Sequence, residues 1–141
     1  MIGALIDGKK LFYRWYDRLN ALAFIQFCKE LIASLPQGKY VFILDNAPAH
    51  KAALTKKYLA TITEQIEVEF LLTYSPQLNC IETCWKIARH EVTSANFFKS
   101  IELLKKGIEQ YLGENDFMLN PSNYLSQRLF TENLYNYQHI Y

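Results

Sequence analysis

Two carboxylates, Asp45 and Glu82, are the side chains of this chain whose types and spacing could do chemistry. Asp45 directly follows the apolar run Tyr40–Leu44, which is typical of a strand buried on both faces. Glu82 falls in the first turn of an expected helix. Ligands commonly bind at the carboxyl ends of strands in open α/β sheets. Convergence of the two acids would supply the oxygen ligands that Mg²⁺ or Mn²⁺ prefers, so we expect a divalent-metal site.

Local structural roles are the alternative for the same part of the sequence. Asp45 and Asn46 precede an expected helix and could simply cap it. Asn79 and Glu82 have the spacing of a capping box. His50 lies one turn into the first of these helices, where a histidine more often packs or hydrogen-bonds locally. Taken one at a time, these residues leave both interpretations open.

The order of two motifs favours a functional site. Leu44–His50 reads LDNAPAH, and Tyr74–Lys86 reads YSPQLNCIETCWK. Together they resemble the second half of the catalytic domain of DDE transposases, in the bacterial insertion-sequence branch related to mariner elements. That family's pattern is Asp-Asn-x-x-x-His and then Tyr-Ser-Pro-x-Leu-Asn-Pro-Ile-Glu-x-x-Trp, and this chain has Cys80 where the family usually has Pro. The resemblance covers roughly residues 2–95 and weakens through 112.

The resemblance implies a ribonuclease-H-like α/β fold, with a mixed sheet flanked by helices, and metal-assisted phosphoryl transfer on DNA. Three acids hold two metal ions in such sites, about 3.5–4 Å apart. By motif position, Asp45 would be the second acid and Glu82 the third. Lys86 and Arg89 follow Glu82 on the same helical face, which suits contacts with DNA phosphates. The residues that we expect at the DNA are Asn46, His50, Lys86 and Arg89.

The first acid of the family has no match here. In the family it lies on a strand that precedes the hairpin expected at 2–16. Asp7 and Asp17 are the only aspartates before Asp45, and neither fits, because Asp7 is a turn residue and Asp17 follows the second strand. The family's upstream helix-turn-helix region is absent too. We therefore expect a catalytic-domain fragment lacking the N-terminal part, with a weakened metal pair and little or no catalysis alone.

The same strand lies in the middle of the family's sheet, so its loss affects folding as well. Without it, the hairpin and the strand ending at Asp45 would expose backbone edges, which proteins rarely leave bare. The chain must close the gap directly, borrow a strand from a second copy, or use its tail. We expect a homodimer, or assembly with a complementing upstream transposase fragment.

Periodicity and breakers predict the elements that position these residues. Asp7-Gly8 is a hairpin signal between two strands, and Asn20 is a candidate helix cap before a stop at Pro36-Gln37-Gly38. The expected elements are strands Ile2–Ile6, Leu11–Tyr16, Tyr40–Leu44 and Val68–Leu72, and helices over 21–35, from Pro48, over Cys80–Val92 and over 98–112. In the helix after Pro48, the residues expected to face the core are Leu54, Tyr58 and Leu59. In the helix over Cys80–Val92 they are Ile81 and Trp85. In the last helix they form the stripe Ile101, Leu104, Ile108 and Leu112, and Gly113 is expected to end that helix.

Composition sets the broad class. Of 141 residues, 50% are hydrophobic, enough for one core. The net charge of +1 excludes a histone-like polycation, so DNA binding must depend on local basic residues. The three cysteines cannot all pair, and Cys80 and Cys84 lack a second ligand pair at zinc-like spacing, so free thiols in a reducing, cytoplasmic setting are expected. No apolar run approaches the ~20 residues that a membrane span needs.

Residues 113–141 differ from residues 1–112, which we interpret as the partial catalytic domain. They are acidic, rich in aromatics and Asn, and typical of an appendage that packs on something. The first functional hypothesis is a transposase catalytic fragment acting on transposon ends and target DNA. The alternative is a non-catalytic dimerising or DNA-binding remnant that modulates transposition.

Overall fold

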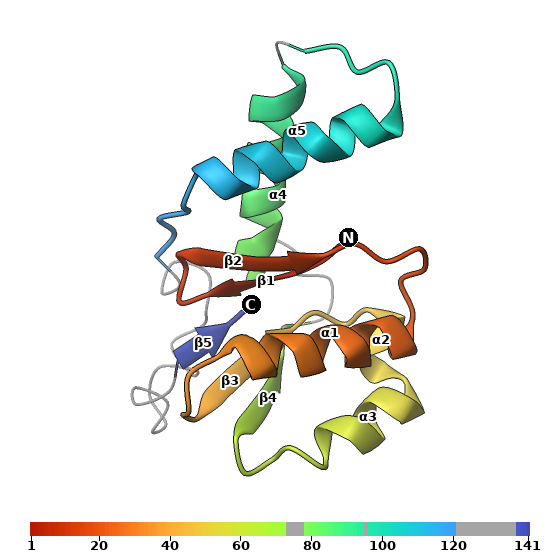
Figure 1. Ribbon diagram of the computed structural model, residues 1–141. Helices are drawn as coiled ribbons and strands as arrows, with labels where there is room; N and C mark the ends of the chain where they lie inside the picture. The colour runs from red at the N-terminus through yellow and green to blue at the C-terminus, as the bar shows by residue number, and fades with distance from the viewer. Residues whose placement is uncertain (73–77, 95, 121–137) are drawn as a thin grey trace.

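The computed structural model describes residues 1–72, 78–94, 96–120 and 138–141, and these form a sheet with helices on both faces (Figure 1). The strands are β1 (Ile2–Ile6), β2 (Lys10–Arg14), β3 (Tyr40–Leu44), β4 (Ile66–Phe70) and β5 (Gln138–Ile140). The helices are α1 (Ala21–Ser34), α2 (Pro48–Lys51), α3 (Ala53–Leu59), α4 (Cys80–Thr93) and α5 (Ile101–Glu114). The expected α/β class, a mixed sheet flanked by helices, is confirmed.

The strand order is β2-β1-β5-β3-β4. β1 is antiparallel to β2 and β5, whereas β3 is parallel to β4 and β5. The C-terminal strand β5 thus lies between β1 and β3, in the gap that sequence analysis expected to be open (Figure 1). Of the three ways to close that gap, the chain uses its own tail. The homodimer stays a prediction, but along β5 the backbone edges that motivated it are paired within one chain.

Few bonds hold β5 against the hairpin. Leu5 and Tyr141 exchange both backbone hydrogen bonds, at 2.7 and 3.0 Å, and the Asp7 N–H donates to the His139 carbonyl at 2.8 Å. The His139 N–H in turn donates to Asp7 Oδ1 at 2.9 Å. Asp7 and Gly8 have positive φ angles of 49° and 72°, as a tight turn between strands requires. The turn residue Asp7 therefore also anchors the end of the tail.

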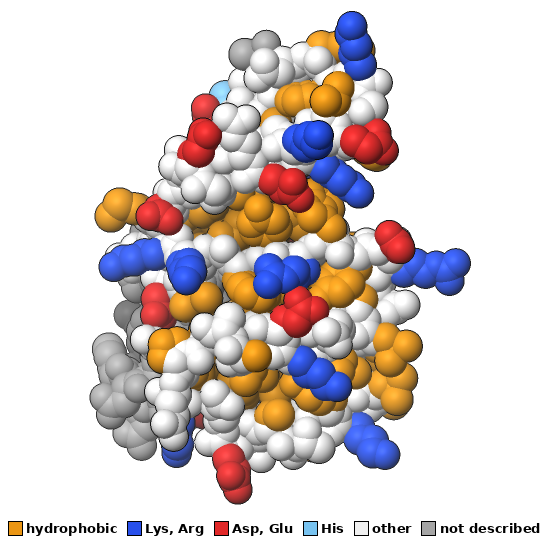
Figure 2. Space-filling model, in the orientation of Figure 1, with side chains coloured by type: hydrophobic (Ala, Val, Ile, Leu, Met, Phe, Trp, Pro, Cys, Tyr) orange, Lys and Arg blue, Asp and Glu red, His pale blue; other side chains and the backbone are white. Residues whose placement is uncertain are grey.

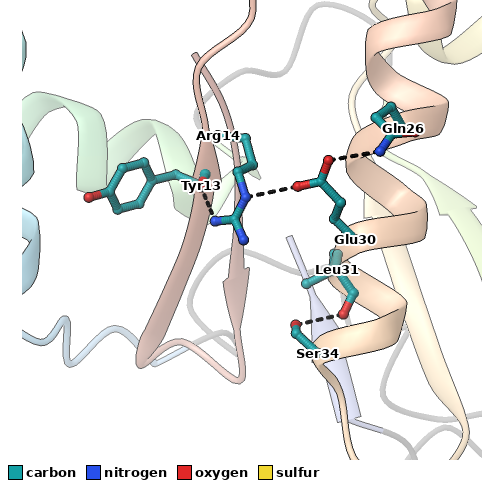
Figure 3. A network of polar contacts seen from close by, with 6 residues as sticks. All are labelled: Tyr13, Arg14, Gln26, Glu30, Leu31 and Ser34. Atoms are coloured by element: carbon teal, nitrogen blue, oxygen red, sulfur yellow. Dashed lines mark hydrogen bonds and ion pairs between the residues drawn. The ribbon is translucent and has the colours of Figure 1, made fainter.

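One face of the sheet packs on α1 and α3. Asn20 caps α1 as expected, its side chain accepting the Ala23 N–H at 3.0 Å. The buried side chains Phe24, Phe27, Cys28 and Leu31 of α1 share a core with Ala4, Phe42, Leu44, Leu59 and Ile140. The Arg14–Glu30 ion pair, at 2.8 Å, joins β2 to α1 above this core, and Gln26 donates to the other Glu30 oxygen (Figure 3).

The opposite face packs on α4. Leu5, Val41 and Ile43 of the sheet meet Cys80, Ile81 and Cys84 of α4, together with Phe117 and Tyr141. Phe117 and Tyr141 belong to the expected appendage 113–141, whose described parts therefore contribute to the central core. α5 crosses α4, and hydrophobic side chains lie between this helix pair and the hairpin (Figures 1 and 2). No helix among the described residues has both the length and the apolar content to cross a membrane.

Four of the expected elements differ from the structure. β2 ends at Arg14, two residues before the expected Tyr16. The helix after Pro48 is split at Ala52, which is extended, so the second helix starts in a new direction and leaves Leu54 56% exposed. β4 starts at Ile66, two residues before the expected Val68, because Ile66 pairs with Tyr40 at the start of β3. Leu72 therefore lies beyond the strand and is exposed. α5 starts after its cap Ser100 and continues through Gly113 to Glu114. Ile101, placed in that exposed first turn, is 64% exposed.

The contact between β1 and α4 depends on a glycine. A Cβ atom added at Gly3 would lie 2.6 and 2.7 Å from two ring carbons of Trp85. We therefore expect Gly3→Ala to lower the free energy of unfolding by about 1–3 kcal/mol, the usual range for overpacking, as measured by urea denaturation. Gly38→Ala is the matched control, because its nearest neighbour would be 3.5 Å away. Equal stability of the two variants would contradict this packing.

Candidate active site

Asp45 and Glu82 lie on the wall of one cavity of about 140 Å³. The cavity sits between the start of β1, the end of β3, α1 and the first turns of α4, with the end of the tail on one side. Its polar side chains are Asp45, His50, Asn79, Glu82 and Tyr141, and the rest of the wall is mostly apolar. The structure therefore brings the two predicted acids together on one surface, although 36 residues separate them in the sequence.

The carboxylate of Asp45 is held through one of its two oxygens. Oδ1 accepts the Ala47 N–H at 2.9 Å and lies 2.8 Å from His50 Nδ1. Oδ2 has no hydrogen-bond partner among the residues that the structure describes. The Asp45 pKa lies below its ordinary value, chiefly because of the His50 hydrogen bond, with the Ala47 N–H adding to the effect and partial burial opposing it. Asp45 therefore presents an ionised, oriented carboxylate with one oxygen available to a ligand.

His50 is the residue that orients Asp45. Its Nδ1 lies 2.8 Å from the Asp45 carboxylate and 3.2 Å from the Asp45 carbonyl oxygen, and two acceptors require a proton on that nitrogen. Its ring packs on Phe24 of α1, with centroids 4.3 Å apart. The local packing and hydrogen bonding that is typical of such a histidine is thus present. Its contact with DNA stays a prediction.

Asn46 fastens the same loop to the neighbouring strand end. Its Nδ2 donates to the Leu71 carbonyl at 2.7 Å, and the Leu71 N–H donates to the Leu44 carbonyl at 2.8 Å. These bonds fix the direction in which the chain leaves β3 and therefore the position of Asp45. Asn46 is not among the residues that line the cavity. Its expected DNA contact is untested.

The interpretation of Asn79 and Glu82 as a capping box is wrong. Asn79 is the N-cap residue of α4, but its side chain makes no cap hydrogen bond. The Glu82 carboxylate has no hydrogen-bond or ion-pair partner among the described residues, and its first-turn position is favourable for a negative charge. Asn79 is 7% exposed and lines the cavity beside Glu82, with its Oδ1 unpaired among the described residues. Sequence reasoning missed it as a site residue, because Asn before a helix is the ordinary signal of a cap.

The basic residues of α4 lie away from the acids' cavity. Lys86 and Arg89 are both exposed. Arg89 lines a second, largely apolar groove with Trp85, Leu104 and Ile108, between α4 and α5. Neither basic residue lines the cavity of Asp45 and Glu82, so their contacts with DNA phosphates stay predictions.

Other parts of the second motif have structural roles or lie outside the description. Residues 74–77, which supply its Tyr-Ser-Pro-Gln, are outside the described residues. Cys80 and Cys84 are buried free thiols, as expected, and burial raises the pKa of each to about 12. Ile81 is buried and Trp85 packs against the same core, so both face inward as expected. These residues hold α4 on the sheet and so position Glu82.

The donor set suits a hard divalent cation but is small. Two carboxylates and an amide are oxygen ligands of the kind that Mg²⁺ and Mn²⁺ take. Within the described residues, no group of three or more His, Cys, Asp or Glu side chains is placed to hold a metal ion. No Lys or Arg lines the cavity to neutralise its two carboxylates. The charge of the site therefore favours a cation from solution.

The fold and cavity define an α/β protein with two carboxylates on the wall of one cavity, where the central parallel strand ends. The sequence profile of the DDE superfamily endonucleases matches residues 1–105, and the chain therefore belongs to that family. The match includes Asp45 and Glu82, whereas β5 lies outside it. Membership indicates a transposase-like nuclease with a DNA substrate and divalent-metal chemistry. No curated protein gives a significant match to the chain.

The Asp45–His50 contact predicts how the free energy of unfolding changes at acid pH. Because the pKa of Asp45 is lower in the folded state, ionised Asp45 stabilises the fold above the ordinary Asp pKa of about 3.9, and this contribution is lost as the pH falls through the lowered value. His50→Ala should raise the Asp45 pKa and flatten this acid-side loss, as followed by carboxyl NMR titration and urea unfolding. His90→Ala, which removes an exposed histidine paired with Glu91, is the control and should change neither. An unchanged Asp45 pKa in His50→Ala would refute the coupling.

Proposed function

We propose that this chain is a DDE transposase catalytic core of the insertion-sequence branch related to mariner elements, acting on transposon ends and target DNA. The observation that carries the proposal is the shared cavity of Asp45 and Glu82, which come from distant parts of the sequence. Asp45 is ionised and held by His50 and Ala47, and Glu82 is held by the packing of α4. These are the two acids that the resemblance of the motifs implies as metal ligands.

The proposed chemistry is hydrolysis and strand transfer at DNA phosphodiesters. Bound Mg²⁺ or Mn²⁺ would activate water or a DNA 3′-hydroxyl and stabilise the leaving oxygen. Asp45 and Glu82 would hold the ions, His50 keeps the Asp45 carboxylate oriented, and Asn46 fixes the loop that carries it. Lys86 and Arg89 would contact phosphates on the exposed side of α4.

We propose that catalysis by this chain alone is weak or absent. The family uses three acids, and among the described residues no third acid joins Asp45 and Glu82 in a metal-binding group. We further propose that the active form is a homodimer or includes a complementing upstream transposase fragment. β5 pairs with three of the five residues of β3, whereas β4 pairs with all five. A longer strand supplied by either partner could therefore pair with more of β3 than β5 does. The free cysteines suit work in the cytoplasm.

Metal binding tests the site directly. Calorimetric titration of the full chain with Mn²⁺ should show binding at micromolar to low-millimolar concentration, abolished by Asp45→Asn and by Glu82→Gln, because each removes one of the two ionic ligands. Glu91→Gln is the matched control, since this exposed acid lies on α4 outside the cavity lining. Binding that persists in Asp45→Asn would rule out the proposed site.

Sedimentation velocity tests the proposed partners. The chain alone should sediment as a dimer, and its affinity for a labelled DNA duplex should fall as the salt concentration rises. Lys86→Ala and Arg89→Ala should each lower the slope of log affinity against log salt by about 1, because each removes one phosphate contact. Lys39→Ala, at the opposite end of β3 from Asp45, should leave the slope unchanged. A monomer at all concentrations would exclude the homodimer, and equal effects of all three variants would exclude the α4 contact.

The alternative function is a non-catalytic DNA-binding or dimerising remnant that modulates transposition. The absence of a third acid from the described part of the site favours it. It predicts salt-sensitive DNA binding that survives Asp45→Asn and Glu82→Gln, whereas the catalytic proposal also requires metal-dependent cleavage that both variants abolish.

A further inference from the structure

β5 fills only part of the strand position between β1 and β3 (Figure 1). It pairs with residues 40–42, and within the described chain residues 43 and 44 have no strand partner on that edge of β3. On the other side, the pairing of the tail with β1 stops at Leu5, which exchanges both backbone hydrogen bonds with Tyr141. Residues 2–4 of β1 pair only with β2 in the part of the chain that the structure describes. Two unpaired strand edges therefore flank the space beyond Tyr141.

The cavity of Asp45 and Glu82 lies in this space, which we call the open strand position. Its wall includes residues 2–4 and residues 43 and 44, together with Tyr141 at the end of the tail. Side chains of α1 cover it from one face of the sheet, and side chains of α4 cover it from the other. Strands along two sides and helices on both faces are the surroundings of a central strand. The cavity is therefore the part of a strand position that β5 leaves unfilled.

The β3 edge of the open strand position presents backbone groups that have no strand partner among the described residues. The Leu44 carbonyl accepts the Leu71 N–H on the β4 side. Because alternate residues of a strand direct their backbone groups to the same side, the Ile43 carbonyl and the Asp45 N–H point the other way, into the open strand position. Ile43 is 2% exposed, and buried backbone groups almost always have a hydrogen-bond partner. The wall around them is mostly apolar, which suits the side chains of an inserted strand better than it suits water.

Gly3 presents matching backbone groups from β1. Leu5 directs its N–H and C=O groups to Tyr141, and by the same alternation Gly3 directs its own groups into the open strand position. A strand that continued the line of β5 past Tyr141 would bond first to Ile43 and Asp45, and one residue later to Gly3. Continued register places this second residue beside Asp45, so two residues span the gap.

We propose that the open strand position binds an extended segment of another polypeptide, parallel to β3 and antiparallel to β1, which displaces β5 and pairs with the whole of β3. The segment must be apolar on both faces, because all five residues of β3 beside it are buried. Its residue in register with Asp45 lies on the α4 face, as Ile43 does, and Glu82 lines the cavity from that face. The partner thus contributes a side chain to the cavity of the two acids. The inference rests on the proposed function, in which a second chain donates a strand, and it names the surface that receives that strand.

β5 competes for this position and is held to the hairpin by few bonds. Two of them join Asp7 to His139: the Asp7 N–H donates to the His139 carbonyl at 2.8 Å, and Asp7 Oδ1 accepts the His139 N–H at 2.9 Å. Asp7→Gly removes the second bond and keeps the turn, because glycine readily adopts the positive φ of 49° at Asp7. Asp7→Asn is the matched control, since asparagine retains an acceptor and tolerates this backbone conformation.

The first test fills the open strand position from within the chain. Val-Val appended after Tyr141 should slow hydrogen exchange of the Gly3 and Asp45 amides by about tenfold or more in NMR spectra, because both amides gain a carbonyl partner. The Ala4 and Leu44 amides, which point to β2 and β4, should exchange as before. Appended Pro-Pro is the control, since proline has no N–H to continue the pairing. Unchanged exchange at Gly3 and Asp45 in the Val-Val chain would overturn the inference.

The second test supplies the strand as a separate molecule. The labelled peptide Gln-His-Ile-Tyr-Val-Val repeats residues 138–141 with the same two valines, and its binding to the full chain is followed by fluorescence anisotropy in EDTA. It should bind about tenfold more tightly than Gln-His-Ile-Tyr, because the added residues pair with β1 and β3. It should bind Asp7→Gly more tightly than the wild-type chain and Asp7→Asn like the wild-type chain. No binding to Asp7→Gly, or equal affinity of the two peptides, would exclude strand exchange.

The strand site and the proposed function fail in different ways. Peptide binding by a chain that binds no Mn²⁺ would leave the strand site standing and remove the metal chemistry. Mn²⁺ binding that Asp45→Asn abolishes, together with unchanged Gly3 exchange in the Val-Val chain, would leave the metal site standing and refute the strand site.

Discussion

The structure depends on one constraint, which is that β3 must be hydrogen-bonded along both edges while both of its faces are buried. All five residues of Tyr40–Leu44 are buried, and buried backbone groups must find partners. β4 supplies them along all five residues of one edge, and β5 supplies them for three residues of the other. A three-residue segment from the end of the chain therefore completes the center of the sheet, and the direction of β3 determines where Asp45 emerges.

The site is assembled from the two faces of that sheet. α1 and α2 supply Phe24 and His50 on one side, and α4 and its N-cap residue supply Glu82 and Asn79 on the other. His50 is fixed both by its tilted ring contact with Phe24 and by the Asp45 carboxylate, and so the orientation of Asp45 is decided before any ligand arrives. Such preorganisation would suit the proposed metal site, because ligands already held in place lose little freedom on binding.

The position of Glu82 depends on packing far from its own charge. Cys80, Ile81 and Cys84 fill the core under α4, and Trp85 lies directly on Gly3 of β1. The buried thiols are inert because burial raises their pKa values, and they act here as small apolar side chains. An acid at the start of a well-anchored helix is therefore presented to the cavity without any hydrogen bond of its own among the described residues.

Sequence reasoning could locate the elements whose signals are local. The Asp7-Gly8 turn, the Asn20 cap of α1, the apolar run of β3 and the span of α4 all depend on residues close together in the chain. The order of the two acidic motifs likewise identified Asp45 and Glu82 as the candidate acids.

Other features of the fold depend on contacts between residues that are distant in the chain. Residues 138–140 have no pattern of a strand, and they form β5 only because β1 and β3 present free edges on both sides. Leu54 is exposed because Ala52 breaks the helix, and Asn79 has the sequence signal of a cap but a side chain that lines the cavity. Local residue patterns thus specify the separate helices and strands and the chemical types of the side chains at the site. The fold settles which strand fills the sheet and which polar side chains line the cavity, because those outcomes depend on pairing and packing between residues far apart in the chain.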